Sequence, residues 1–234
     1  MKKYRTLLFD VDDTLLDFDA AEKFALRKLF EEQDFPLTTE VEYRYRKINT
    51  GLWMGFEEGK LTLDGVLNSR FSLLFKEYGL EKDGALLEKK YRSLLAESHQ
   101  LMPGAFELIS ELQNHFDLYI VTNGVSETQH RRLSDSGLYP FFQDIFVSEE
   151  TGFQKPLKGF FDYVFSRIPN FSTENCLIIG DSLSSDMKGG KNAGIDTCWF
   201  NPNLQSNLTD ILPTYQIQKL DELYKVLDLG VLTK

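Results

Sequence analysis

The segment RTLLFDVDDTLLD, from Arg5 to Asp17, places Asp10, Asp12 and Asp13 directly after a short apolar run. The apolar run predicts a buried β-strand. Two carboxylates about 4 Å apart repel by about 4 kcal/mol at an effective dielectric constant of ~20. No lysine or arginine lies among these aspartates, so a positive charge from elsewhere in the fold, or from solution, must offset the repulsion.

The composition is that of a globular protein with an acidic balance. Of 234 residues, 42% are hydrophobic and 26% are charged, which suits one large domain or a domain with an insertion. The formal net charge of -10 argues against broad contact with nucleic acid or an anionic membrane surface. It does not exclude a small anionic substrate. The apolar stretch after Met1 ends too early for a signal peptide, and no apolar run approaches a membrane span.

The two cysteines indicate a reduced protein. Cys176 and Cys198 lie in the apolar segments CLIIGD and TCWFN, without the spacing of metal ligands. Such positions are typical of buried free thiols. We therefore expect a cytoplasmic location.

A long helical block interrupts the pattern of strands. Residues 17–100 carry apolar residues at helical spacing, and turn signals such as GFEEGKLT separate the helices. From Met102 onward, apolar strands alternate with amphipathic helices, one of which is expected to open with a capping box, SETQ, at residues 126–129. This alternation predicts a parallel sheet covered on both faces. The expected fold is α/β, a doubly wound parallel sheet formed by residues 1–16 and 101–234, with an inserted all-helical domain at residues 17–100.

Polar residues follow the predicted strands, at the place where open α/β sheets bind ligands. Taken singly, each is also typical of a turn, a helix cap or a solvated surface. Because they converge on one sheet edge, we favour a site in which Mg²⁺, bound by hard oxygen ligands, offsets the acid repulsion and bridges to phosphate. The residues are Asp10, Asp12, Asp13 and Thr14 after the first strand, Thr122 and Asn123 after LYIV, Lys155 beyond DIFVS, and Asp181 with Asp186 after CLIIG.

These motifs resemble those of the haloacid dehalogenase (HAD) superfamily of aspartate-nucleophile phosphatases. DVDDT at residues 10–14, VTNG at 121–124, KP at 155–156 and GDSLSSD at 180–186 occur in the family's order. The helical insertion looks like the small helical cap of that family. The resemblance therefore implies a Rossmann-like core with a helical cap and a phosphomonoester substrate.

The resemblance also implies catalytic roles. Asp10 would be the nucleophile and would form an aspartyl-phosphate intermediate. Asp12 would protonate the leaving oxygen and later accept a proton from the attacking water. Thr122, Asn123 and Lys155 would bind the phosphoryl oxygens, with Lys155 as the fixed positive charge.

A magnesium site is implied beside the nucleophile. The Asp10 carboxylate, the Asp12 backbone carbonyl and Asp181 would hold the ion. Asp186 would lie behind these ligands and orient Lys155 or a metal-bound water.

Particular residues distinguish the proposed phosphatase from other functions. Asp12 favours phosphoryl chemistry, because the dehalogenase branch lacks an acid at this position and needs no metal. Asp13 and Thr14 are the commoner phosphatase form, whereas phosphomutases usually carry glycine after the second aspartate. A phosphorylation-controlled receiver domain also gathers acids, threonine and Lys-Pro at strand ends, but it has no counterpart of the insertion or of GDSLSSD. A catalytically silent scaffold is disfavoured because no expected residue is missing.

The expected partner is a small phosphorylated metabolite, and no obligate protein partner is evident. INTGLWMGFEEGKLT and LNSRF resemble the cap of house-cleaning 5'-nucleotidases that act on pyrimidine nucleoside monophosphates. By that resemblance, Trp53 and Phe56 would offer a face to the base, and Asn49 or Arg70 a polar contact. The same aromatic residues are also typical of helix packing. A sugar phosphate or another small phosphometabolite is the alternative substrate.

Overall fold

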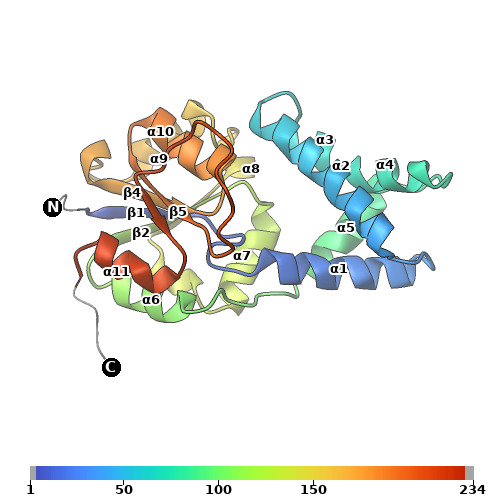
Figure 1. Cartoon of the computed structure of the whole chain (residues 1–234), viewed down its shortest axis with the longest axis horizontal. Helices are drawn as coiled ribbons and strands as arrows, with labels where there is room; N and C mark the ends of the chain where they lie inside the picture. The colour runs from blue at the N-terminus through green and yellow to red at the C-terminus, as the bar shows by residue number, and fades with distance from the viewer. Residues whose placement is uncertain (1–3, 230–234) are drawn as a thin grey trace. The chain divides into compact units, whose positions relative to one another are not determined.

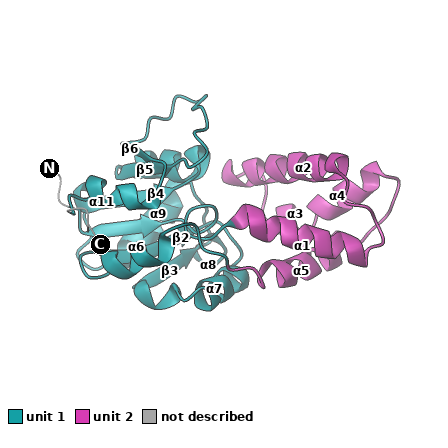
Figure 2. Ribbon diagram, turned by 60° about the horizontal axis from the view of Figure 1, so that its bottom comes forward, with its two compact units in different colours: residues 1–17, 100–234 teal, residues 18–99 magenta. Residues whose placement is uncertain are grey.

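The computed structural model describes residues 4–229. Residues 1–3 and 230–234, which the sequence assigns to the ends of the core domain, lie outside the described residues. The chain divides into two compact units, unit 1 (residues 1–17 and 100–234) and unit 2 (residues 18–99) (Figure 2). Among residues 4–229, no helix has both the length and the apolar character required to cross a membrane.

Unit 1 contains a six-stranded parallel sheet with the order β3-β2-β1-β4-β5-β6. The chain moves from β1 to β2 and β3 on one side, and then to β4, β5 and β6 on the other. The predicted doubly wound parallel sheet is thereby confirmed. The direction in which successive strands are added reverses between β1 and β4. The strands are β1 (Thr6–Phe9), β2 (Asp117–Thr122), β3 (Asp144–Val147), β4 (Cys176–Gly180), β5 (Asp196–Phe200) and β6 (Tyr215–Ile217).

Helices cover both faces of this sheet (Figure 1). Successive side chains of a strand point to opposite faces, so Leu7 and Phe9 pack with α6 and α11, whereas Leu8 packs with α9. Cys176 and Cys198 are buried free thiols, as expected. The helices are α6 (Ala105–Leu112), α7 (Ser126–Asp135), α8 (Ser148–Thr151), α9 (Lys158–Arg167), α10 (Lys188–Ala193) and α11 (Leu223–Val226), with short turns η1 (Tyr139–Phe141), η2 (Thr173–Asn175), η3 (Leu183–Met187, π-helical) and η4 (Leu220–Glu222).

Unit 2 is all-helical and has its own apolar core. Thr38, Thr62 and Asp83 precede α2, α3 and α5, and each side chain accepts a backbone N–H of the first turn. Apolar residues of α1, α2, α4 and α5 form one buried cluster. The helices are α1 (Phe18–Glu32), α2 (Thr39–Glu57), α3 (Leu63–Leu67), α4 (Arg70–Glu77) and α5 (Gly84–Leu95).

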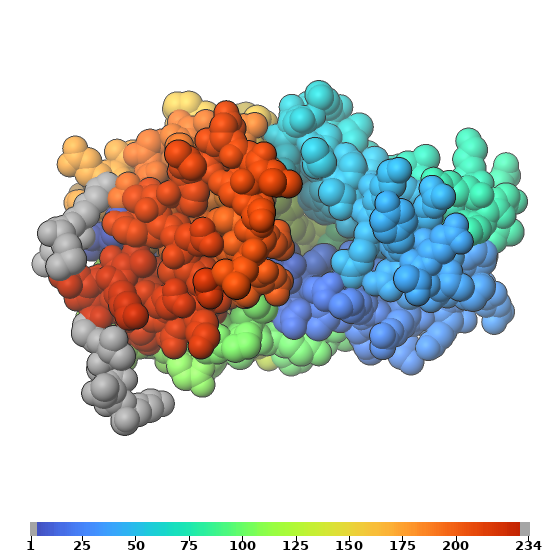
Figure 3. Space-filling model, viewed as in Figure 1, coloured from blue at the N-terminus to red at the C-terminus, as the bar shows by residue number. Residues whose placement is uncertain are grey.

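The connection between β5 and β6 is an exposed segment of unit 1. Residues 201–214 appear in orange on the surface toward the viewer (Figure 3). Asn201 anchors the start of this segment, because its side-chain amide bonds to both the N–H and the C=O of Gln205. The segment continues into the edge strand β6.

Candidate active site

The carboxyl ends of β1, β2 and β4 meet at one edge of the sheet in unit 1. β1 lies between β2 and β4, and all three run parallel. Asp10 follows β1 and donates its backbone N–H to Ile179 O at 2.9 Å. Thr122 ends β2 and Gly180 ends β4. The parallel register therefore brings these strand ends, with Asp181 after β4, to one place.

Lys155 supplies a positive charge to this edge. Its ammonium Nζ donates to Asp10 Oδ1 at 2.7 Å, Asp186 Oδ1 at 2.6 Å and Val121 O at 2.7 Å. The side chain is 2% exposed. Burial disfavours its charge, but the carboxylates of Asp10 and Asp186 outweigh this and raise the pKa of Lys155 above its ordinary value. Part of the positive charge that the acidic segment requires therefore comes from within the fold.

The acids exceed what Lys155 can neutralise. Burial raises the pKa of Asp10 to about 7; Lys155 opposes this rise, and the charges of Asp186 and Asp12 add to it. Burial, followed by the charges of Asp10 and Asp186, also raises the pKa of Asp181 well above its ordinary value. One carboxylate oxygen from each of Asp10, Asp181 and Asp186 lies within 4.8 Å of the others. Hard oxygen donors with excess negative charge are a set that fits Mg²⁺.

Asp186 is already engaged on both oxygens. Oδ1 accepts from Lys155, and Oδ2 accepts the backbone N–H of Ser182 at 3.1 Å. A Cβ added at Gly180 would lie 2.2 Å from Asp186 Oδ2, so only glycine at the end of β4 lets this carboxylate approach. These contacts suit a residue that orients Lys155, which leaves Asp10 and Asp181 as the better-placed metal ligands.

The two polar residues at the end of β2 differ in what they contact. Thr122 Oγ1 accepts the Gly124 N–H at 3.0 Å, within the end of the strand. Asn123 Nδ2 donates to Lys155 O, and the Lys155 N–H donates to Asn123 Oδ1, both at 2.9 Å. The amide of Asn123 is thus bonded to the backbone of Lys155, which differs from the expected phosphate contact. β2 and β3 are neighbouring parallel strands, so the segments that follow them are adjacent and Asn123 can contact Lys155.

Asp12 is held by two residues of α7 that the sequence reasoning did not identify. Arg132 Nη1 donates to Asp12 Oδ1 and, at 3.1 Å, to Gln129 Oε1. Gln129 Nε2 donates to Asp12 Oδ2 at 2.8 Å and to Thr122 Oγ1 at 3.0 Å. The Arg132 side chain is 0% exposed and that of Asp12 is 29% exposed. A second cation of the fold therefore reaches the acidic segment.

The predicted capping box explains why Gln129 was missed. The expectation that Gln129 caps the helix is wrong, because Val125 is the N-cap residue, no side chain caps it, and the Ser126 N–H donates to Glu149. Gln129 and Arg132 are three residues apart on one face of α7, and both are buried. The sequence did carry a signal for these two residues. Both are polar, yet both occupy positions of α7 that face the interior.

In unit 2, two of the four cap candidates are buried. Arg70 is 1% exposed and donates to both carboxylate oxygens of Glu88 at 2.6 and 2.7 Å, and to Asn49 Oδ1 at 3.0 Å. Phe56 is 6% exposed. The buried guanidinium of Arg70 is thus paired with a carboxylate of its own unit. The expected substrate contacts of Arg70 and Phe56 stay predictions.

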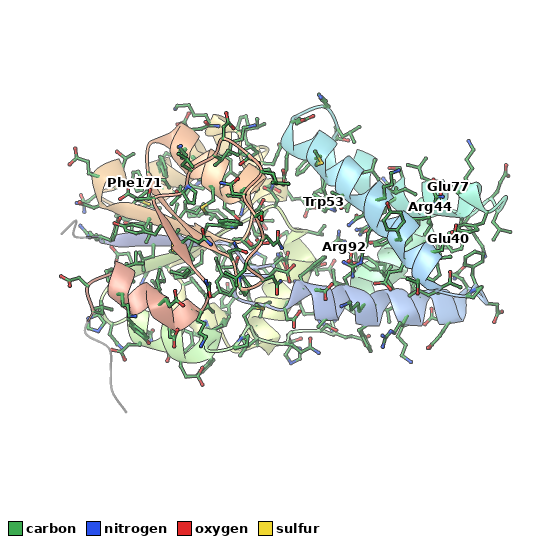
Figure 4. The ribbon with its side chains drawn as sticks, in the orientation of Figure 1. Glu40, Arg44, Trp53, Glu77, Arg92 and Phe171 are labelled. Carbon is green, nitrogen blue, oxygen red and sulfur yellow. The ribbon has the colours of Figure 1, made fainter. Side chains whose placement is uncertain are left out.

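Trp53 is the cap candidate with the most accessible ring. It lies on α2 (Figure 4), is partly exposed, and meets the Phe56 ring edge-on with centroids 5.7 Å apart. Phe56 therefore supports the ring of Trp53 from within unit 2. Trp53 remains a candidate for contact with a base.

Comparison with known proteins identifies relatives over nearly the whole chain. A family model described as haloacid dehalogenase-like hydrolase matches residues 4–194. The chain is 66% identical over 229 residues to the HAD-hydrolase YfnB of Bacillus subtilis strain 168, covering 98% of this chain and 97% of that protein. The orthorhombic crystal structure of YfnB, described as bound to magnesium, matches with a TM-score of 0.92 and covers 97% of this chain and 100% of that chain.

Two further relatives are named for an activity. Pyrimidine 5'-nucleotidase PynA of Streptococcus pneumoniae is 42% identical over 232 residues, covering 99% of this chain and 98% of that protein. Pyrimidine 5'-nucleotidase YjjG of Escherichia coli K12 is 32% identical over 225 residues, covering 96% of this chain and 98% of that protein. The predicted resemblance to this branch is confirmed.

Proposed function

Because this chain belongs to the haloacid dehalogenase-like hydrolases, we propose that it is a magnesium-dependent phosphatase that acts on pyrimidine nucleoside 5'-monophosphates. The observation that carries the proposal is the arrangement around Asp10, a buried carboxylate at a strand end with Lys155 at 2.7 Å and a second acid, Asp12, beside it. A nucleophile, a fixed cation and a proton carrier are the groups that phosphoryl transfer through a covalent intermediate requires.

In the proposed reaction, Asp10 is the nucleophile and Asp12 transfers the protons. A carboxylate oxygen of Asp10 attacks phosphorus, and the ester oxygen leaves as the alcohol with a proton from Asp12. Water then attacks the aspartyl phosphate, gives a proton to Asp12, and releases inorganic phosphate together with the free Asp10 carboxylate. The Thr122 hydroxyl donates to a phosphoryl oxygen, and the charge of Lys155, held beside Asp10, offsets the phosphoryl charge.

Asp10 and Asp181, with the backbone carbonyl of Asp12, would hold the magnesium ion. When bound, Mg²⁺ supplies positive charge that reduces the repulsion between the Asp10 carboxylate and the phosphoryl group. The fit rests on the excess of acid over cation at this edge. Asp186 orients Lys155 from the other side.

The relatives PynA and YjjG support a pyrimidine nucleotide as substrate. Trp53, with its partly exposed ring, is the residue of unit 2 that we propose to contact the base. An aromatic face binds a planar base through stacking, which is tolerant of substituents on the ring. Asn49 is proposed as a weaker contact, because it also accepts from Arg70.

A panel of phosphate esters tests the proposed substrate. We expect UMP, dUMP and dTMP to be hydrolysed with kcat/KM at least about tenfold above AMP and sugar phosphates, the scale on which a shaped pocket discriminates. EDTA should suppress every one of these activities. Preference for a sugar phosphate would overturn the nucleotide assignment alone, whereas absence of hydrolysis across the panel would overturn the phosphatase assignment.

The pH dependence of stability tests the metal site. Without metal, the pKa of Asp10 is raised from 3.8 to about 7, so this carboxyl stabilises the fold below 3.8 and loses that contribution as the pH rises to about 7. Magnesium binds the ionised form, and we expect the rise in Tm on adding MgCl₂ to be larger at about pH 8 than at about pH 5.5. An equal or larger rise at the lower pH would count against a site at these aspartates.

A further inference from the structure

The contact between α7 and Asp12 is built from buried polar side chains. Gln129 is 1% exposed and Arg132 is 0% exposed, whereas the Asp12 side chain keeps 29% of its surface exposed. Both carboxylate oxygens of Asp12 accept a hydrogen bond from these two residues. The acid is thus held from its buried side while part of it stays open to a reactant.

Arg132 also sets the orientation of the Gln129 amide. The guanidinium has only donors, so the amide end that it contacts at 3.1 Å must be the oxygen, Oε1. The NH₂ end is then the end that faces Asp12 and Thr122. If the amide of Gln129 were flipped, its NH₂ group would face the guanidinium of Arg132, donor against donor. Only one orientation of the amide therefore forms the hydrogen bond.

This orientation determines what the Thr122 hydroxyl can do. A hydroxyl oxygen has two acceptor lone pairs and one donor hydrogen. Thr122 Oγ1 accepts from the Gly124 N–H and from Gln129 Nε2, both at 3.0 Å. Its hydrogen is therefore the part left to bind a phosphoryl oxygen.

Gly124 makes the approach of Gln129 sterically feasible. A Cβ at this position would lie 2.5 Å from Gln129 Nε2 and 2.7 Å from its Cγ and Cδ. Such distances require the glutamine to move. Glycine in the VTNG segment thus serves the side-chain contact and not the turn alone.

We propose that Gln129 and Arg132 are positioning residues, which fix Asp12 for proton transfer and direct the Thr122 hydroxyl toward the phosphoryl group. The inference rests on the proposed phosphatase function and deepens it. Arg132 bonds directly to Asp12 and reaches Thr122 through Gln129, whereas Gln129 bonds to both Asp12 and Thr122. Without Arg132, the Asp12 carboxylate would still accept from Gln129 Nε2 and hold the amide in this orientation.

The leaving group distinguishes this role from a structural one. A nucleoside leaves as an alkoxide that needs a proton from Asp12, whereas p-nitrophenolate is a stable anion that leaves without one. Hydrolysis of the aspartyl phosphate also uses Asp12, but it is common to both substrates and does not enter kcat/KM. A residue that positions Asp12 should therefore affect kcat/KM for nucleotides, and affect kcat/KM for p-nitrophenyl phosphate much less. General loosening of the fold would lower both rates together.

The experiment compares R132M with its neighbour control R131M on the two substrates. Arg131 lies on the same helix, is 54% exposed and pairs with Asp135 at 3.6 Å. For R132M we expect kcat/KM on UMP to fall on the order of 10–10²-fold, as for a misplaced catalytic group. The kcat/KM on p-nitrophenyl phosphate should change less than about threefold, and R131M should match the wild type in both assays.

A double-mutant cycle and a second variant complete the test. In the D12N background, R132M should lower kcat/KM on UMP by less than about a further threefold, because the group that Arg132 positions is already altered. Q129M leaves the Arg132–Asp12 pair in place and should raise KM for both substrates through Thr122, while kcat/KM should fall further on UMP than on p-nitrophenyl phosphate through Asp12. It keeps the inference testable if R132M does not fold, which thermal unfolding would show.

An equal loss of kcat/KM on both substrates in R132M would overturn the inference, as would an equal loss in Q129M if R132M does not fold. So would full additivity of D12N and R132M. A failure of the proposed function looks different, because the wild type would then hydrolyse neither substrate. Selective loss in D12N without selective loss in R132M would keep the phosphatase mechanism and remove the role of Arg132.

Discussion

Substitution of Asp10 by asparagine should abolish hydrolysis of both UMP and p-nitrophenyl phosphate. This change removes the carboxylate oxygen that we propose as the nucleophile, and we expect kcat to fall on the order of 10⁴–10⁶-fold, the scale seen when a covalent nucleophile is removed. Asparagine has the shape of aspartate, and Lys155 keeps Asp186 as an ion-pair partner at 2.6 Å. The fold should therefore persist, which a thermal unfolding curve would verify.

The matched control is D13N. Asp13 is in the same acidic segment, but its backbone has a φ of 55°, a conformation that asparagine also accepts. The same change from carboxyl to amide at this position should leave kcat within about threefold of the wild type, as for a group outside the reaction. Activity in D10N comparable to that of D13N would rule out an attack by Asp10.

Substitution of Lys155 by methionine should lower both activity and stability. The ammonium contacts Asp10, Asp186 and a backbone carbonyl and is almost wholly buried, and breaking a buried ion pair typically costs about 3–5 kcal/mol. Loss of a fixed charge beside the phosphoryl group should also lower kcat by about 10²-fold or more. Chemical denaturation in EDTA and steady-state kinetics with magnesium measure the two effects.

The stability loss in K155M should depend on pH. Lys155 opposes the rise in the Asp10 pKa, so its removal raises that pKa further. A carboxyl with a raised folded pKa stabilises the fold when protonated and loses this contribution as the pH rises. The deficit relative to the wild type should therefore be larger at about pH 8 than at about pH 5.

Lys158 is the matched control for this prediction. It lies three residues further along, is 67% exposed and pairs with exposed Asp162. An exposed pair of this kind contributes about 0–1 kcal/mol, so K158M should resemble the wild type in denaturation and in kcat. A K155M protein as stable as K158M at high pH would contradict the assigned charge balance at Asp10.

The motifs at the strand ends could be predicted because each is a short, continuous stretch of sequence. An apolar run that ends in aspartate identifies both a buried strand and a reactive end, and parallel strands bring such ends to one edge. DVDDT, VTNG and GDSLSSD therefore indicated the fold class and the residues around Asp10. The cap was harder, because buried and ligand-facing aromatic residues look alike in a helical sequence, and Phe56 proved to be buried.

The amino-acid sequence by itself determined the doubly wound sheet, the helical insertion and the types of residue that gather at the sheet edge. Only the tertiary structure decided which charge offsets which. Lys155 is 145 residues from Asp10, and Arg132 is 120 residues from Asp12. Electrostatic energy depends on distance through space and on burial, and neither quantity can be read from positions along the chain.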